Sequence, residues 1–409
     1  MKIKTALAAV LVGLLSAVLF RSSAFADFRI LVASDIHYIA PSITDGGACY
    51  QQALDNGDSK FMPYSEEICE AFLDEVLAER PDALLLTGDL TFNGSILSHE
   101  ALAGKLGRLK EAGIPVLVTT GNHDVYNANA AAFHGDSYTA LPSAETDSFA
   151  EIYADFGLKE ALSAAPDSLS YVWPVSESEW ILVLDLNTEH DFCGISDDTL
   201  AWAESCLREA SDKDIKVIAC GHQNIFQHSI FRGGYVIDGA DRLASLFREY
   251  AVPLYLSGHL HIQHILEEDG LAEIAASALC SYPCQYGVLE VRGDRLSYST
   301  RELDMALWAE KSSRSDPVFR DFQSAAAEYM TGHLKVETPG SAESREMTDY
   351  IQKLNLAYFS GDLREVEELD PDGHLSRLWM EDGDLFSLYV ASVLADSGKD
   401  FTVWTGRFS

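Results

Sequence analysis

The sequence predicts an α/β protein with a helical C-terminal region, and two observations lead to this fold class. Between residue 28 and about residue 260, short apolar runs alternate with segments that carry apolar residues at helical spacing. From about residue 304 the patterns are helical and rich in Ala, Leu, Glu and aromatic residues. The alternation is typical of a sheet with helices packed on its faces. The change near residue 304 indicates a smaller all-α domain.

Three strands and two helices are expected in the first third of the chain. The apolar runs at 28–34, 82–87 and 115–120 have the length and composition of buried strands. Between them, segments 65–80 and 98–113 have the apolar spacing of amphipathic helices. This order is typical of strands joined by helical crossovers, which makes neighbouring strands parallel.

The remaining elements change in character along the chain. Further buried strands are expected at 180–186, 216–220 and 253–256. After residue 262, strand patterns follow one another closely with turn residues between them, which indicates a mixed or antiparallel section. Helices are then expected at 318–330, 343–360 and 383–398. We therefore divide the chain into a signal peptide at 1–26, a catalytic domain at 27–303 and a C-terminal helical domain at 304–409.

The first 26 residues have the pattern of a secretory signal peptide. Lys2 and Lys4 give a positive start, residues 5–20 are apolar, and Ala24-Phe25-Ala26 resembles a cleavage site. We therefore expect an exported protein, whether extracellular, periplasmic or attached to the cell envelope. An uncleaved N-terminal anchor is the alternative, although the apolar run is short for a membrane span.

The charge of the chain limits its partners. The formal net charge is −35, and removal of Lys2, Lys4 and Arg21 with the signal peptide makes it −38. A surface this acidic repels polyanions, so nucleic-acid polymers and anionic lipid surfaces are not expected as partners. No later stretch is apolar enough to form a transmembrane segment. An anionic substrate would need a local positive charge, which bound divalent cations supply.

Seven cysteines are an odd number for an exported chain, so at least one is free or pairs between molecules. Cys280 and Cys284 are close enough in sequence to form a local bridge, and Cys49 with Cys69 is a second candidate pair. The sequence does not determine the connectivity.

Metal-ligating side chains follow five of the predicted strands at their carboxyl ends. The candidates are Asp35, His37, Asp89, Asn122, His222, His259 and His261. In open α/β sheets the carboxyl edge is where ligands bind. Seven donors exceed the needs of one ion and suit two divalent ions that share a carboxylate. Nitrogen and oxygen ligands without a thiolate favour Mn, Fe or Zn. In the His259-Leu260-His261 pair, one histidine can then serve each ion.

These motifs, in the order DxH, GD, GNHD, GH and GHxH, resemble the calcineurin-like metallophosphoesterase superfamily. The segments TGDLTFNG, GNHDVYN and SGHLH resemble more closely exported bacterial phosphodiesterases of the class III cyclic-nucleotide type with a C-terminal helical domain. The resemblance covers roughly residues 28–300. It implies an αββα sandwich of two mixed β-sheets flanked by helices.

The resemblance also implies a role for each site residue. The first ion would be held by Asp35, His37, Asp89 and His261, and the second by Asp89, Asn122, His222 and His259. His123 would be a non-ligand histidine that contacts the phosphate or protonates the leaving oxygen. Asp124, its neighbour, is a candidate catalytic residue that would orient His123. The protein-phosphatase branch carries Asp-Arg-Gly downstream of its GD, whereas the stretch here is Gly88-Asp89-Leu90-Thr91-Phe92-Asn93-Gly94, which disfavours phosphoprotein substrates.

We therefore predict a dinuclear-metal phosphoesterase that hydrolyses small phosphodiesters or phosphomonoesters by attack of a metal-bridging water. Cyclic nucleotides are suggested by the resemblance alone. The alternative is an extracellular binding or adhesion module that holds metal without turnover. Among the other histidines, His99, His228 and His264 are interpreted as surface or loop residues, with His228 and the loop 231–234 as further candidates for substrate contact.

Overall fold

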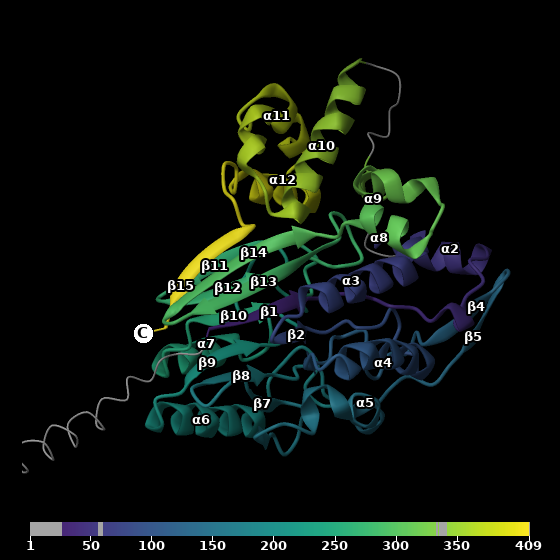
Figure 1. The fold of residues 1–409 in the computed structure, drawn as a ribbon. Coiled ribbons are helices and arrows are strands. Elements are labelled where there is room, and N and C mark those ends of the chain that lie inside the picture. The colour runs from purple at the N-terminus through teal and green to yellow at the C-terminus, as the bar shows by residue number, and fades with distance from the viewer. Residues whose placement is uncertain (1–26, 56–59, 333, 335–341, 409) are drawn as a thin grey trace, which may run out of the picture.

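Two mixed β-sheets form the centre of the protein (Figure 1). The computed structural model describes residues 27–55, 60–332, 334 and 342–408; the predicted signal peptide lies outside them. The first sheet has the order β15-β14-β13-β1-β2-β3. Its strands are β1 (Phe28–Ala33), β2 (Ala83–Leu86), β3 (Val116–Val118), β13 (Gln285–Arg292), β14 (Arg295–Glu302) and β15 (Val403–Arg407). Strands β1, β2 and β3 are parallel, whereas β13 to β15 pair antiparallel.

The second sheet has the order β11-β12-β10-β9-β8-β7-β6. Its strands are β6 (Ser163–Ala164), β7 (Tyr171–Pro174), β8 (Glu179–Val183), β9 (Lys216–Cys220), β10 (Leu254–Ser257), β11 (His264–Glu268) and β12 (Leu271–Ala275). The four central strands β12, β10, β9 and β8 are parallel, and the outer ones pair antiparallel. The predicted strands therefore exist, and their ends shift by only a few residues.

Helices cover the outer face of each sheet. Helices α3 (Ser65–Glu79) and α4 (Ile96–Glu111) pack on the first sheet, and α6 (Asp197–Asp212) and α7 (Ala240–Glu249) pack on the second. Along β1, Leu31 and Ala33 face the helices, whereas Ile30 and Val32 face the second sheet. This alternation is the period of a strand buried on both sides. The αββα sandwich is confirmed.

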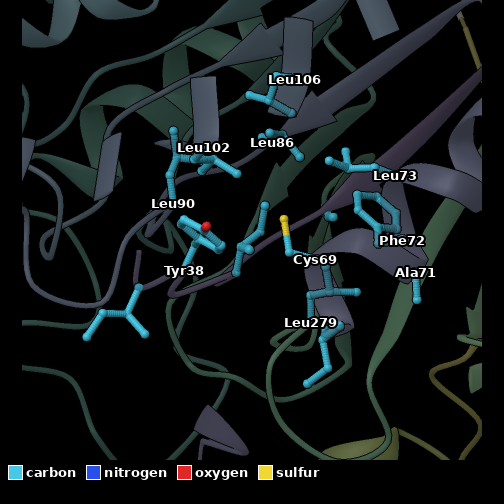
Figure 2. Packing of buried hydrophobic residues seen from close by; sticks show 14 of the residues in the cluster. Tyr38, Cys69, Ala71, Phe72, Leu73, Leu86, Leu90, Leu102, Leu106 and Leu279 are labelled. Carbon is cyan, nitrogen blue, oxygen red and sulfur yellow. The ribbon is translucent and has the colours of Figure 1, made fainter. Parts of the chain in front are cut away.

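The contact between α3, α4 and β2 shows how the outer layer is held (Figure 2). Phe72, Leu86 and Leu102 are at most 1% exposed in one cluster. Burial of each such side chain contributes about 1.5–3 kcal/mol. Tyr38, just after β1, lies in the same cluster, and its hydroxyl donates a hydrogen bond to Glu66 at 2.8 Å. The loop that follows β1 is thereby attached to the helical layer.

The C-terminal region divides into two packing groups. Helices α8 (Met305–Ser312) and α9 (Phe322–Thr331) contribute to the cluster on the first sheet. Helices α10 (Ala342–Ser360), α11 (His374–Met380) and α12 (Leu385–Leu394) share a separate cluster and form the yellow-green group of Figure 1. The boundary at residue 303 stays a prediction. None of the helices in the described residues is long and apolar enough to cross a membrane.

Some elements were not predicted from the sequence. Strand β15 pairs with β14 and returns the end of the chain to the first sheet. Its alternating pattern is short and largely exposed, so tertiary pairing decides its structure. The other unpredicted helices are α2 (Ala48–Asp55), α5 (Thr146–Ile152), α6, α7, α8 and α11. The other unpredicted strands are β6, β7 and the hairpin β4 (Ala131–His134) and β5 (Ser137–Ala140), and short 3₁₀ or π segments lie at 41–43, 62–64, 154–158, 317–321 and 364–369.

All seven cysteines are free thiols in the structure. Neither of the two candidate pairs, Cys280–Cys284 and Cys49–Cys69, forms a disulfide, which corrects that expectation. Burial raises the pKa of Cys69 and of Cys280 to about 12, so both thiols stay protonated and unreactive at neutral pH.

Candidate metal centre

The loops at the carboxyl ends of five strands meet at one point. They follow β1, β2, β3, β9 and β10, as the sequence predicts. Ligand atoms of Asp35, His37, Asp89 and His261 lie within 4.8 Å of one another, and so do those of Asp89, His222 and His259. Asp89 belongs to both groups. The Asn122 side-chain oxygen lies 3.2 Å from His222 Nε2, beside the second group. All seven predicted ligands therefore come together in two adjoining sets.

The spacing of these atoms fits bound cations. His37 Nε2 lies 3.3 Å from His261 Nε2 and 3.6 Å from Asp89 Oδ2, and His261 Nε2 lies 3.3 Å from Asp35 Oδ1. Ligands bonded to one ion at about 2.0–2.2 Å are separated by about 3.0–3.6 Å. Asp35 Oδ1 is buried and has no hydrogen-bond partner among the described residues. A buried set of acceptors that face one another is costly unless a cation lies between them.

Most of the ligand residues have an unusual backbone. Asp35, His37, Asp89, His259 and His261 all have positive φ, between 46° and 71°. This left-handed conformation costs a non-glycine residue about 1–2 kcal/mol. Strain of this kind is concentrated at functional sites. In the His259-Leu260-His261 segment both histidines have this left-handed conformation, and they belong to different sets.

Two positions at the site require glycine because neighbouring loops come very close to them. A Cβ atom on Gly121 would lie 2.1 Å from the Asp89 backbone nitrogen, and one on Gly258 would lie 1.7 Å from Ser34 Oγ. Neither glycine has positive φ. At these two positions glycine is required because two loops lie too close together to admit a side chain.

The electrostatics of the second set favour a cation. Burial opposes ionisation of Asp89, but His222 and His123 hold its pKa well below the usual range. Burial also disfavours the charged form of His222, yet Asp89, 3.3 Å away, raises the pKa of His222 to about 9. Burial and the charge on His222 lower the pKa of His259 to about 4. Without metal, His222 therefore carries a proton that a bound ion would displace.

Backbone groups orient the ligands. His222 Nδ1–H donates to the Thr87 carbonyl and His259 Nε2–H donates to the Gly234 carbonyl, both at 2.8 Å. The opposite ring nitrogens are thereby left to bind metal. The backbone N–H of His123 donates to Asp89 Oδ1 at 2.7 Å, and that of His259 donates to Asp35 Oδ2 at 3.0 Å. Each of these two carboxylates is held through one oxygen, and its other oxygen remains available to bind a metal ion.

The structure places His123 at the site but gives Asp124 another role. His123 Nδ1–H donates to the Phe92 carbonyl at 2.8 Å, which leaves Nε2 for a substrate. The Asp124 carboxylate is fully buried and accepts hydrogen bonds from the backbone N–H groups of Leu90, Thr91 and Gly121. The prediction that Asp124 orients His123 is therefore wrong, because its side chain points into the loops that carry Asp89. The orienting group is a carbonyl, which no side-chain pattern reveals.

His99 is a second residue that the sequence placed wrongly. It is fully buried, its Nε2–H donates to the Asp124 carbonyl at 2.9 Å, and its Nδ1 accepts from the Tyr153 hydroxyl at 3.0 Å. Helix α4 begins at Ile96, two residues before the predicted start, and this turns His99 toward the core. His99 therefore supports the loop behind His123.

A cavity of about 490 Å³ opens onto the metal-binding residues. Asp89, Asn122, His123, His259 and His261 line one side of it. The other side consists of residues from the loop 229–235 and from α10 and α12. A volume of this size accommodates a small organic ligand.

The fold and the site define a metal-dependent hydrolase with a dinuclear centre. The sequence model of the calcineurin-like phosphoesterase family matches residues 28–263. The chain belongs to this family, whose members are phosphoric ester hydrolases with two metal ions.

One solved structure agrees with this assignment at the level of the fold, and a second is similar with a lower TM-score. A dimetal phosphatase from Danio rerio is 14% identical, with 67% of this chain and 96% of that chain covered and a TM-score of 0.52. A purple acid phosphatase from yellow lupin (Lupinus luteus) seeds is 13% identical, with 68% and 52% covered and a TM-score of 0.42. No curated protein sequence matches significantly.

Proposed function

We propose that this chain is an exported phosphoesterase that hydrolyses small phosphodiesters or phosphomonoesters, with cyclic nucleotides among the candidate substrates. One observation carries the proposal: two ligand sets share Asp89 and lie beside His123 in a single cavity. The alternative, a metal-containing binding module without turnover, would not need a non-ligand histidine held with a ring nitrogen free at the same cavity.

The chain supplies the ligands and their orientation. Asp35, His37, Asp89 and His261 would hold one ion, and Asp89, Asn122, His222 and His259 would hold the other. Two bound divalent ions neutralise phosphoryl oxygens and lower the pKa of water toward neutrality. The hydrogen bonds to Thr87 and Gly234 fix the ring orientations beforehand, so little reorganisation is needed during the reaction.

His123 is the residue we assign to the leaving group. Its Nδ1–H is committed to the Phe92 carbonyl, so Nε2 is the atom that can hold a proton for the leaving oxygen or donate to a phosphoryl oxygen. Its ring lies 4.7 Å from that of His37, measured between centroids, next to the first ligand set. Either role needs a ring nitrogen at this position.

The substitution His123→Ala tests this role. We expect bound metal to stay near wild type and kcat to fall by about 10²–10⁴-fold on alkyl phosphoesters, because a general acid contributes that much. The loss should be smaller on bis-p-nitrophenyl phosphate, whose leaving group needs no proton. Exposed His134 is the matched control, and His134→Ala should retain full rate. An equal loss on both substrates would contradict proton donation, and silence of the metal-loaded wild type between pH 5 and 9 would favour the binding module.

Export rests on the first 26 residues alone. The basic start, the apolar run and Ala24-Phe25-Ala26 support cleavage before Asp27. N-terminal sequencing of the protein secreted by producing cells should begin at or near Asp27. A chain that keeps residues 1–26 and sediments with membranes would instead be anchored.

A further inference from the structure

Beside the candidate metal-binding residues, the cavity is lined by aromatic side chains. Phe231 and Tyr235 come from the loop between β9 and α7, Tyr358 and Phe359 from α10, and Tyr389 from α12. Two regions more than one hundred residues apart in sequence thus contribute rings to one surface. We call these five side chains the aromatic wall.

The rings of the aromatic wall begin directly beside the metal-binding residues. The Tyr235 ring centroid lies 5.1 Å from that of His259 and 5.7 Å from that of Phe231. On the helical side, the centroids of Tyr358 and Tyr389 lie 5.6 Å apart in an edge-to-face contact. A phosphoester bound at the metal centre would therefore place its organic group against these rings.

The cavity is poor in positive charge. Among the described residues that line it there is no lysine and no arginine, and Asp89 is the only carboxylate among them. A second phosphate or a polyanionic substrate would find no cationic side chain there to bind it. Aromatic faces without such cations suit a flat, uncharged ring, which stacks on them.

The aromatic wall is attached to the ligand loop itself. The backbone N–H of Gln263 donates to the Phe359 carbonyl at 3.2 Å, and Gln263 Nε2 donates to the Phe401 carbonyl at 3.0 Å. Ile262, directly after His261, is 2% exposed in the cluster of α10, α11 and α12. The position of α10 is therefore fixed relative to the metal-binding histidines, as a specificity surface requires.

We propose that the aromatic wall is a subsite for the organic group of the substrate, and that it selects phosphoesters carrying a flat, uncharged ring. The ring can be a nucleobase or an aryl group, since both stack in the same way. The C-terminal helical region is then part of the substrate site. This inference rests on the proposed phosphoesterase activity.

Substrate pairs with the same scissile bond test the subsite. Adenosine 5′-monophosphate and ribose 5-phosphate differ by the base alone, and benzyl phosphate and ethyl phosphate differ mainly by the aryl ring. For diesters, the 2,2,2-trifluoroethyl esters of thymidine 5′-phosphate and of methyl phosphate share one leaving group that carries no ring. We expect kcat/KM to be about 5- to 100-fold higher for the ring-bearing member, which corresponds to one stacked ring. Preference in the nucleoside pairs alone identifies a nucleobase as the ligand, and preference in all pairs identifies any flat ring.

The substitution Phe359→Leu isolates the contribution of the helical region. Phe359 is half-buried and its bond to Gln263 is made by the backbone, so the variant should fold. We expect the ratio within each pair to fall at least fivefold, with kcat/KM for the ring-free member within about twofold of wild type. Phe192→Leu, the same change at an exposed phenylalanine outside the cavity lining, is the control and should leave the ratios unchanged.

A binding measurement distinguishes failure of the aromatic wall as a subsite from failure of the proposed phosphoesterase activity. Calorimetry of metal-free protein with adenosine and with ribose should show binding of adenosine alone, weakened in Phe359→Leu. Equal kcat/KM within every pair would overturn the subsite and leave the phosphoesterase intact. Absence of hydrolysis of all substrates by metal-loaded protein would overturn the proposed function, while adenosine binding would still report on the aromatic wall.

Discussion

At the scale of single residues, Asp89 connects the two halves of the site. One of its oxygens accepts the backbone N–H of His123, and the other lies 3.6 Å from His37 Nε2 and 3.3 Å from His222 Nε2. Its position depends on the close approach of the loop after β3. A small steric change in that loop should therefore disturb both ions together.

The substitution Gly121→Ala tests this dependence. The added Cβ would lie 2.1 Å from the Asp89 nitrogen and 2.2 Å from its Oδ1, where neither atom can move without displacing the ligand. We expect both ions to be lost and turnover to fall at least 100-fold, as measured by metal analysis and hydrolysis of bis-p-nitrophenyl phosphate. Gly104 of α4 is the matched control, because a Cβ added there would have no neighbouring atom within 4 Å. Full metal content in Gly121→Ala would show that the loops can separate.

At the scale of elements, a buried row of side chains joins the second sheet to the helical region. Glu273 of β12 lies 3.2 Å from His228 Nε2, His228 Nδ1 lies 2.9 Å from His264 Nδ1 of β11, and His264 Nε2 lies 3.2 Å from Asp396. His228 Nε2 makes no hydrogen bond with the described residues, so the row has two hydrogen bonds, and two neutral imidazoles supply the two protons that these need. His228 lies in the loop between β9 and α7, as the sequence predicted, but it is buried. His264 is buried within β11, which corrects its interpretation as a surface or loop residue.

The substitution Asp396→Asn should weaken the attachment of α12 to the sheet. It removes the negative charge that accepts the hydrogen bond from His264 Nε2–H, and also the ion pair with Lys399 at 2.7 Å. We expect a loss of about 1–3 kcal/mol in the free energy of unfolding, typical of a hydrogen bond to a charged group. Urea denaturation measures the loss, and hydrogen exchange should show faster opening of α12. Exposed Asp382 provides the control, because its change to Asn should alter neither quantity.

At the scale of the whole molecule, the net charge of −35 opposes the approach of an anionic substrate. Only the metal ions would reverse this field, and they do so locally. Salt screens long-range repulsion within about 10 Å at 0.1 M. The overall charge should therefore affect association and leave the chemical step unchanged.

A change in ionic strength tests whether the overall charge affects association alone. We expect kcat/KM to rise several-fold for a doubly charged phosphomonoester between low salt and about 0.2 M, with kcat constant. A singly charged phosphodiester should show a smaller rise. A fall in kcat/KM with salt would mean that the charge of the metal centre governs the encounter.

The sequence by itself determined the α/β fold class and the seven candidate ligand residues, and its resemblance to the family implied the two mixed sheets of the sandwich. The fold class and the candidate ligands follow from local patterns, because an apolar run that ends in a ligand-type residue predicts a strand and a side chain at its carboxyl end. Asp35, Asp89 and His222 could be named since each follows the end of an apolar run. The predicted bounds of the strands needed only small shifts.

Only the tertiary structure decided which groups meet across the chain. The Phe92 carbonyl that orients His123, the burial of His99, the row from Glu273 to Asp396 and the aromatic wall all depend on segments brought together by folding. Strand β15 likewise forms only because β14 offers a free edge. The hydrophobic pattern of a segment predicts which of its side chains are buried. The hydrogen-bond partner of a backbone carbonyl or of a buried imidazole depends instead on how distant segments pack together.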